Sequence, residues 1–129
     1  MTTFPKTIPN ALRFSLALGL MSVAFECASA AFYANPHDLM VEAIRNGRAS
    51  GVMGGDIAAK FKAQFKSRAP LLVEVWTLKK YRQPGCARLE VDYEKRDVPT
   101  PKGDTSVFLK TQINYCLDGT APQSLEEQP

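Results

Sequence analysis

Residues 86–116 decide the fold of this chain; they read CARLEVDYEKRDVPT followed by PKGDTSVFLKTQINYC. Apolar and polar residues alternate on both sides of a turn rich in proline and glycine. Such alternation is typical of strands that bury one face, so the stretch predicts a β-hairpin with strands at about 86–98 and 105–117. The residues expected on the buried face are Ala87, Leu89, Val91, Tyr93, Val107, Leu109, Ile113 and Tyr115.

The apolar faces of the two strands also select their register. Leu89 opposite Ile113 keeps the apolar residues together, and a slip of one residue would move one set to the other side of the sheet. The same register places Cys86 directly opposite Cys116, within reach of a disulfide at the open end of the hairpin. The sequence therefore predicts a disulfide between Cys86 and Cys116, with two unrelated buried thiols as the alternative.

The first thirty residues have the features of a secretory signal peptide. Lys6 and Arg13 give a positive start, and residues 14–25 are apolar or small. Ala28-Ser29-Ala30 then fits a cleavage site with small residues at its two ends. We therefore expect residues 1–30 to be removed and the protein to be exported to the bacterial periplasm.

Two other interpretations of this segment stay open. An uncleaved anchor would need a longer apolar run to span a bilayer comfortably. A lipoprotein would be modified at Cys27, but Glu26 stands where a small residue is needed. Cleavage after Ala30 would remove Cys27 and leave an even pair of cysteines, as a single structural disulfide in an exported protein requires.

The expected mature chain is long enough for one small domain, and we expect that domain to cover residues 31–119. The segment 120–129 reads TAPQSLEEQP; it has no apolar pattern and predicts a disordered tail. Of the 16 basic and 13 acidic residues of the chain, two basic and one acidic precede residue 31, which leaves a net charge of +2. This balance argues against a nucleic-acid partner.

Two helices are expected before the hairpin. An Asn-Pro start at 35–36 and the glycine at position 47 bound a first helix at about 36–46. The segment 47–55, GRASGVMGG, holds four glycines and predicts a mobile loop or hinge. A second amphipathic helix is expected at about 56–66, because apolar residues recur there at four-residue spacing: Ile57, Phe61 and Phe65.

A third strand at about 71–81, LLVEVWTLKKY, leads through a Gln83-Pro84-Gly85 turn into the hairpin. The sequence therefore predicts an α+β fold in which the two helices pack on a three-stranded antiparallel meander stapled by one disulfide. The 71–81 strand would lie at an edge and is apolar on both faces. Either the helices cover both sides of the sheet, or one face keeps a partner-binding patch, with the candidates Trp76, Leu78 and Phe108.

The residues that could carry chemistry favour a non-enzymatic protein. His37 is the only histidine, and neither a Cys-x-x-Cys nor a GxSxG motif occurs. We therefore expect no catalytic residues, no metal site and no cofactor. Glu90, Asp92 and Glu94 alternate along one strand and could bind Ca²⁺ weakly, but the basic residues around them favour a salt-bridged surface.

We expect a small exported protein that binds a protein partner, for example as a subunit or adaptor of a secretion, conjugation or pilus assembly. Recognition would use a groove for a helix, or strand addition at the edge formed by residues 71–81. The alternative is a periplasmic inhibitor or immunity protein that blocks a partner enzyme with its rigid hairpin tip, residues 99–104. Neither hypothesis requires stable membrane insertion after signal cleavage, and the oligomeric state stays open.

Overall fold

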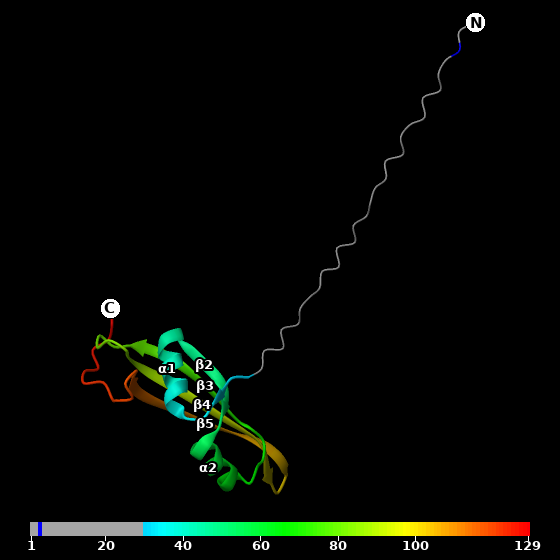
Figure 1. Cartoon of the computed structure of the whole chain (residues 1–129). Coiled ribbons are helices and arrows are strands. Elements are labelled where there is room, and N and C mark those ends of the chain that lie inside the picture. The colour runs from blue at the N-terminus through cyan, green and yellow to red at the C-terminus, as the bar shows by residue number, and fades with distance from the viewer. Residues whose placement is uncertain (1–2, 4–29) are drawn as a thin grey trace.

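The computed structural model describes residue 3 and residues 30–129, so nearly all of the expected signal peptide, including Cys27, lies outside the described residues. Seven elements follow one another along the chain (Figure 1). Their bounds are β1 Phe32–Tyr33, α1 Pro36–Asn46, β2 Arg48–Met53, α2 Gly55–Phe65, β3 Leu71–Lys80, β4 Cys86–Thr100 and β5 Gly103–Cys116.

The sheet has five strands in the order β1-β2-β3-β4-β5, so the prediction of a three-stranded antiparallel meander is wrong. β1 and β2 pair in parallel, and the other neighbouring pairs are antiparallel. Residues 48–53 form β2, although the four glycines of the segment 47–55 predicted a loop. The presence of β2 moves β3 from the expected edge to the interior of the sheet, between β2 and β4.

A glycine in β2 allows the first strand to approach closely. The Val52 amide donates a hydrogen bond of 2.8 Å to the Ala31 carbonyl, beside the short β1 strand. A β-carbon on Gly51 would lie 2.2 Å from that carbonyl oxygen and 2.9 Å from the ring of Tyr33. Glycine at position 51 therefore allows the two strands to come into contact, and the prediction of a mobile loop is wrong for residues 48–53.

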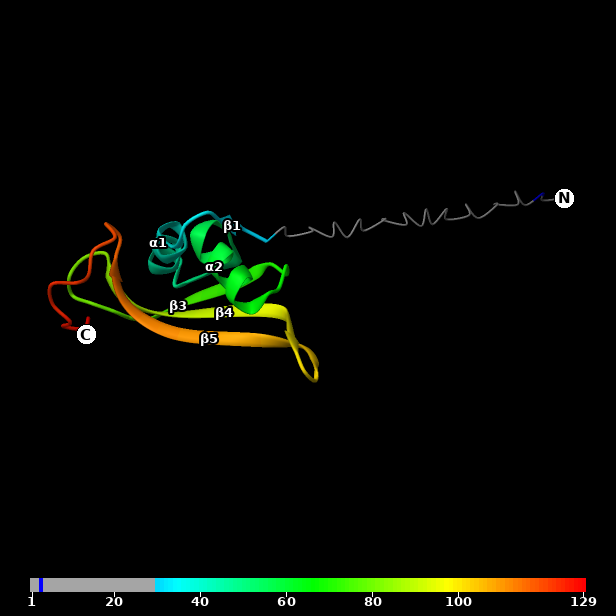
Figure 2. The ribbon, with the colours of Figure 1, turned by 90° about the horizontal axis from the view of Figure 1, so that it is seen from below.

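Both helices lie on one face of the sheet and leave the opposite face open (Figure 2). α1 occupies the expected range, with the Asn35 side chain accepting a hydrogen bond of 3.1 Å from the Asp38 amide, and Gly47 ends it with a φ of 84°. No helix in the described part of the chain combines the length and apolar character needed to cross a membrane. The core between helices and sheet includes Leu39, Ala43, Ile44, Met53, Leu71, Val73, Val75, Leu89 and Val91.

The β4–β5 hairpin has the register that its apolar faces predict. Leu89 pairs with Ile113, and Cys86 pairs with Cys116. A disulfide joins these two cysteines, which are 30 positions apart in the chain. The hairpin continues past α2, and its tip projects beyond the helical layer (Figure 2).

The segment 120–129, for which the sequence predicts disorder, lies back against the end of β3 in the structure. Tyr81 and Glu127 form an isolated antiparallel bridge. The composition of this tail predicts disorder because the tail offers little apolar surface to bury. Backbone hydrogen bonds and charged side chains hold it instead, as described below.

Candidate protein-binding surface

The sheet face opposite the helices, here called the open face, presents side chains in rows that run across β2, β3, β4 and β5. Alternate residues of each strand point to this face, so the register of the strands defines the rows. Successive rows contain Val52, Leu72, Glu94 and Phe108; then Ser50, Glu74, Asp92 and Lys110; then Arg48, Trp76, Glu90 and Gln112. The middle of the open face is therefore acidic, and cations flank it on β2 and β5.

The flanking cations pair with the acidic centre. Arg48 lies 2.5 Å from Glu74, and the Lys110 ammonium lies 3.2 Å from Glu90 and 3.9 Å from Asp92. The hydrogen bond that Lys110 donates to Glu90, together with the charges of Asp92 and Glu90, raises the pKa of Lys110. Within residues 30–129, no group of three or more His, Cys, Asp or Glu residues is arranged to hold a metal ion.

The three residues predicted to bind a partner are all exposed, but the structure does not bring them into one patch. Trp76 is 38% exposed, and the Arg48 guanidinium lies 4.3 Å from the centre of its ring. Leu78 is 47% exposed and lies where the β3–β4 register shifts. Phe108 is 72% exposed on β5, separated from Trp76 by β4 and its carboxylates.

A shallow depression of about 440 Å³ lies on the open face, and Phe108, Arg48 and Glu74 are among the residues that line it. Asp92 also lines it, and its Oδ1 atom is buried without a hydrogen-bond partner among the described residues. Buried carboxylate oxygens repel anions. The depression therefore disfavours phosphate or carboxylate ligands beside Asp92.

β5 lies at an edge of the sheet and pairs, within the described residues, with β4 alone. The Cys116 amide donates to the Thr120 carbonyl at 3.0 Å, so the Cys86–Cys116 pair is a non-hydrogen-bonded pair of the ladder. Hydrogen-bonded and non-hydrogen-bonded pairs alternate in an antiparallel ladder. Main-chain donors and acceptors therefore point outward from β5 at Phe108, Lys110, Gln112 and Asn114.

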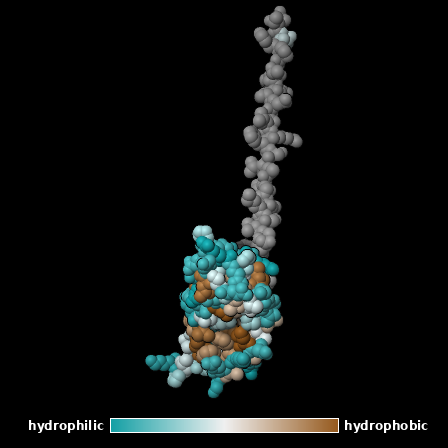
Figure 3. All heavy atoms as spheres, turned by 90° about the vertical axis from the view of Figure 1, so that its left-hand side faces the viewer, coloured by the Kyte–Doolittle hydropathy of each residue, from teal (hydrophilic) through white to brown (hydrophobic). Residues whose placement is uncertain are grey.

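The side chains along this edge are mostly apolar or uncharged. Leu109 is 49% exposed and Ile113 37% exposed on the helix side of the sheet. Between Thr105 and Cys116, Lys110 is the only charged residue. Figure 3 views the molecule from the left-hand side of Figure 1, and hydrophobic residues gather in the lower half of that face. We call the outward backbone groups of residues 108–114, with Leu109 and Ile113, the β5 edge.

Long strands at sheet edges tend to recruit further strands unless several charges, prolines or bulges protect them. The β5 edge has the length and side chains that favour such pairing. Strand addition along β3, by contrast, is excluded from Leu71 to Trp76, because β2 occupies that side of β3. The edge expected along residues 71–81 is therefore covered as far as Trp76 by β2, which the sequence did not predict.

His37 belongs to a structural contact that the sequence analysis did not find. Its Nδ1 atom lies 2.6 Å from the Tyr115 hydroxyl and connects the start of α1 to the end of β5. Burial, followed by the charges of Asp118 and Asp38, raises the pKa of Tyr115. No local pattern could predict this pair, because 78 positions separate its members.

No protein-family model matches the chain, and no curated protein or solved structure is significantly similar to it. Its function is therefore inferred from the surface geometry described above.

Proposed function

We propose that this protein is a small, exported, non-enzymatic binding protein that takes up an extended segment of a partner protein as a sixth strand beside β5. The β5 edge is the observation that carries the proposal. In strand addition, main-chain hydrogen bonds supply affinity, and alternate side chains supply specificity. Here Phe108, on one side of the sheet, and Leu109 and Ile113, on the other, would contact the incoming segment. Such a protein would serve as a subunit or adaptor of a cell-envelope assembly.

Export to the periplasm is part of the same proposal. The signal-like residues 1–30 support it, as does the disulfide, because disulfides persist in oxidising compartments. Cleavage after Ala30 would keep Ala31, whose carbonyl accepts the hydrogen bond from Val52. The mature chain would then contain all of β1. We expect N-terminal sequencing of the protein from its native compartment to begin at Ala31, and a chain that begins at Met1 would contradict export with cleavage.

A matched pair of substitutions at position 112 tests strand addition. Gln112→Pro removes an outward N–H from the β5 edge, whereas Gln112→Ala removes the side chain and keeps that N–H. We expect the wild type and Gln112→Ala to retain the same partner in affinity purification from an envelope extract, and Gln112→Pro to lose it. Hydrogen exchange of the isolated complex should show new protection at residues 108–114.

Thermal unfolding of both variants separates binding from folding. The Gln112 amide does not pair with β4, so we expect the two variants to melt within a few degrees of each other. Retention of the partner by a folded Gln112→Pro protein would exclude the β5 edge as its binding site.

A second candidate function is an inhibitor or immunity protein that blocks a partner enzyme. The projecting hairpin tip favours it, because its residues are exposed beyond the helical layer (Figure 2). In this case Lys102→Glu at the tip, rather than Gln112→Pro, would abolish binding, and the partner would be a single soluble enzyme whose activity falls when the protein is added.

A further inference from the structure

We propose that the end of β3 together with the turn that follows it, residues 79–82, is a second peptide-binding site. It recognises an extended segment of a partner protein that carries two consecutive acidic residues, and the chain's own tail occupies it in this structure. The site lies on the other side of the hairpin from the β5 edge, so the proposal does not depend on strand addition at β5.

The tail fills a place that β2 leaves open. β2 pairs with β3 only as far as Trp76, so the outer edge of β3 continues beyond the end of β2. There the Arg82 amide donates to the Glu126 carbonyl at 2.7 Å, and the Gln128 amide donates to the Lys80 carbonyl at 3.0 Å. These two bonds flank an antiparallel bridge, so the tail binds as a short added strand.

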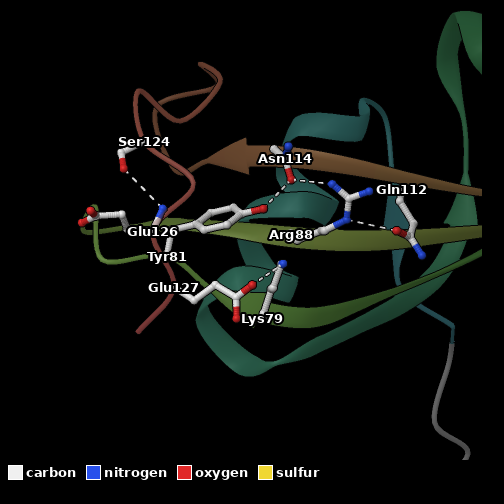
Figure 4. A network of polar contacts seen from close by, with 8 residues as sticks. All are labelled: Lys79, Tyr81, Arg88, Gln112, Asn114, Ser124, Glu126 and Glu127. Carbon is white, nitrogen blue, oxygen red and sulfur yellow. Dashed lines mark hydrogen bonds and ion pairs between the residues drawn. The ribbon is translucent and has the colours of Figure 1, made fainter. Parts of the chain in front are cut away.

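Two cations of the site face the two acidic residues of the tail. The Lys79 ammonium lies 2.5 Å from a Glu127 carboxylate oxygen (Figure 4). Arg82 lies 4.0 Å from the Glu126 carboxylate, and its Nε atom donates to the Glu127 carbonyl at 3.3 Å. Glu126 and Glu127 are the only charged residues of the segment 120–129. Charge complementarity therefore selects an acidic occupant over a basic one.

The floor of the site is held by contacts that do not involve the tail. The Tyr81 hydroxyl donates to Asn114 Oδ1 at 2.6 Å. Arg88 donates to the same oxygen at 2.9 Å and to Gln112 at 3.0 Å (Figure 4). This network connects β3 to β4 and β5. The surface under the tail is therefore organised in advance, which lowers the entropic cost of binding.

The tail itself is held by exposed contacts that a competitor can replace. Leu125, its one large apolar side chain, is 58% exposed. Each exposed ion pair stabilises the bound tail by less than about 1 kcal/mol of free energy. The tail nevertheless excludes weak ligands, because a tethered segment has an effective concentration of about 1 mM. A partner segment enters when it binds more tightly than the tail does.

A labelled peptide of sequence APQSLEEQP, which corresponds to residues 121–129, tests the site by fluorescence anisotropy with the full mature chain. The double variant Glu126→Lys/Glu127→Lys repels its own tail from the site. We expect this variant to bind the peptide at least about tenfold more tightly than the wild type, in which the tail competes. Lys102→Glu, at the distant hairpin tip, is the control and should leave peptide binding unchanged in either background.

A charge swap distinguishes recognition from a general effect on folding. In the chain with its natural tail, Lys79→Glu/Arg82→Glu places like charges opposite Glu126 and Glu127 and so also releases the tail; this variant should not bind APQSLEEQP and should bind APQSLKKQP. Equal binding of both peptides, or equal affinity of the wild type and the tail variant, would overturn the proposal. A concentration-dependent wild-type dimer that Lys79→Glu/Arg82→Glu dissociates would also overturn it, because the occupant would then be the tail of a second copy.

Discussion

Gly51 lies in close contact with Ala31: a β-carbon built on Gly51 would be 2.2 Å from the Ala31 carbonyl oxygen. We expect Gly51→Ala to push β1 away from β2 and to lower the free energy of unfolding by about 1–3 kcal/mol, as overpacking does. Urea denaturation would measure the loss. Ser50→Ala is the matched control, because Ser50 is exposed on the open face; its effect should be below about 0.5 kcal/mol. Equal stability of the two variants would contradict the close approach of the strands.

The disulfide between Cys86 and Cys116 closes a loop of 30 residues and should stabilise the domain by about 3–4 kcal/mol. Replacing both cysteines with alanine should therefore lower the melting temperature by roughly 12 °C or more. Differential scanning calorimetry with and without a reductant would measure this change. The double variant should be insensitive to the reductant, whereas the wild type should melt earlier in its presence. A wild type that melts at the same temperature in both conditions would show that the disulfide does not stabilise the fold.

Tyr33 should make stability depend on alkaline pH. Burial, together with the hydrogen bond that its hydroxyl donates to Glu42 and the charge of that residue, raises the pKa of Tyr33 to about 12. In the unfolded chain its pKa is about 10. The folded state therefore favours neutral Tyr33, and this stabilisation is complete below about pH 10 and disappears as the pH rises to about 12.

Tyr33→Phe isolates this contribution. The variant lacks the hydroxyl. The difference in free energy of unfolding between the wild type and the variant, measured by urea denaturation, should therefore shrink between pH 9 and pH 11.5. The other tyrosines remain in both proteins and cancel in the comparison. An advantage that stays constant over this range would contradict the raised pKa of Tyr33.

Trp76 lies on the open face, and its substitution should affect stability less than a core substitution. Trp76 is 38% exposed, whereas Leu89 is fully buried. We expect Trp76→Ala to lower the free energy of unfolding by about 1–2 kcal/mol and Leu89→Ala by about 2–5 kcal/mol. Chemical denaturation of both variants would measure the difference. If Trp76→Ala were the more damaging change, Trp76 would belong to the core and would be unsuited to partner contact.

The hairpin could be predicted from the sequence because its determinants are local and agree with one another. Alternation of apolar residues sets the faces, and a wrong register would place Leu89 or Ile113 on the wrong side. The first helix was also predictable, because Asn35 and Gly47 are capping residues with a direct effect on the backbone.

The sheet edges could not be predicted, because they depend on contacts between distant residues. Gly51 in β2, together with the glycines on both sides of the strand, indicates a loop until Ala31 and Tyr33 are placed beside Gly51. Without β2, the whole of β3 looks like an edge, whereas β2 covers it from Leu71 to Trp76. The tail raises the same difficulty, because its polar sequence is stabilised only by the backbone groups at the end of β3.

The order of strands in the sheet has a consequence for the rate of folding. Each strand neighbours only the strands that come directly before and after it in the chain. These pairings still join distant residues, because Arg48 pairs with Trp76 and Cys86 with Cys116, and chains that must close long loops fold more slowly than chains with mostly local contacts. Until the β4–β5 hairpin closes, its apolar strands are open to pairing with other chains, so we expect refolding to lose material to aggregation as the protein concentration rises.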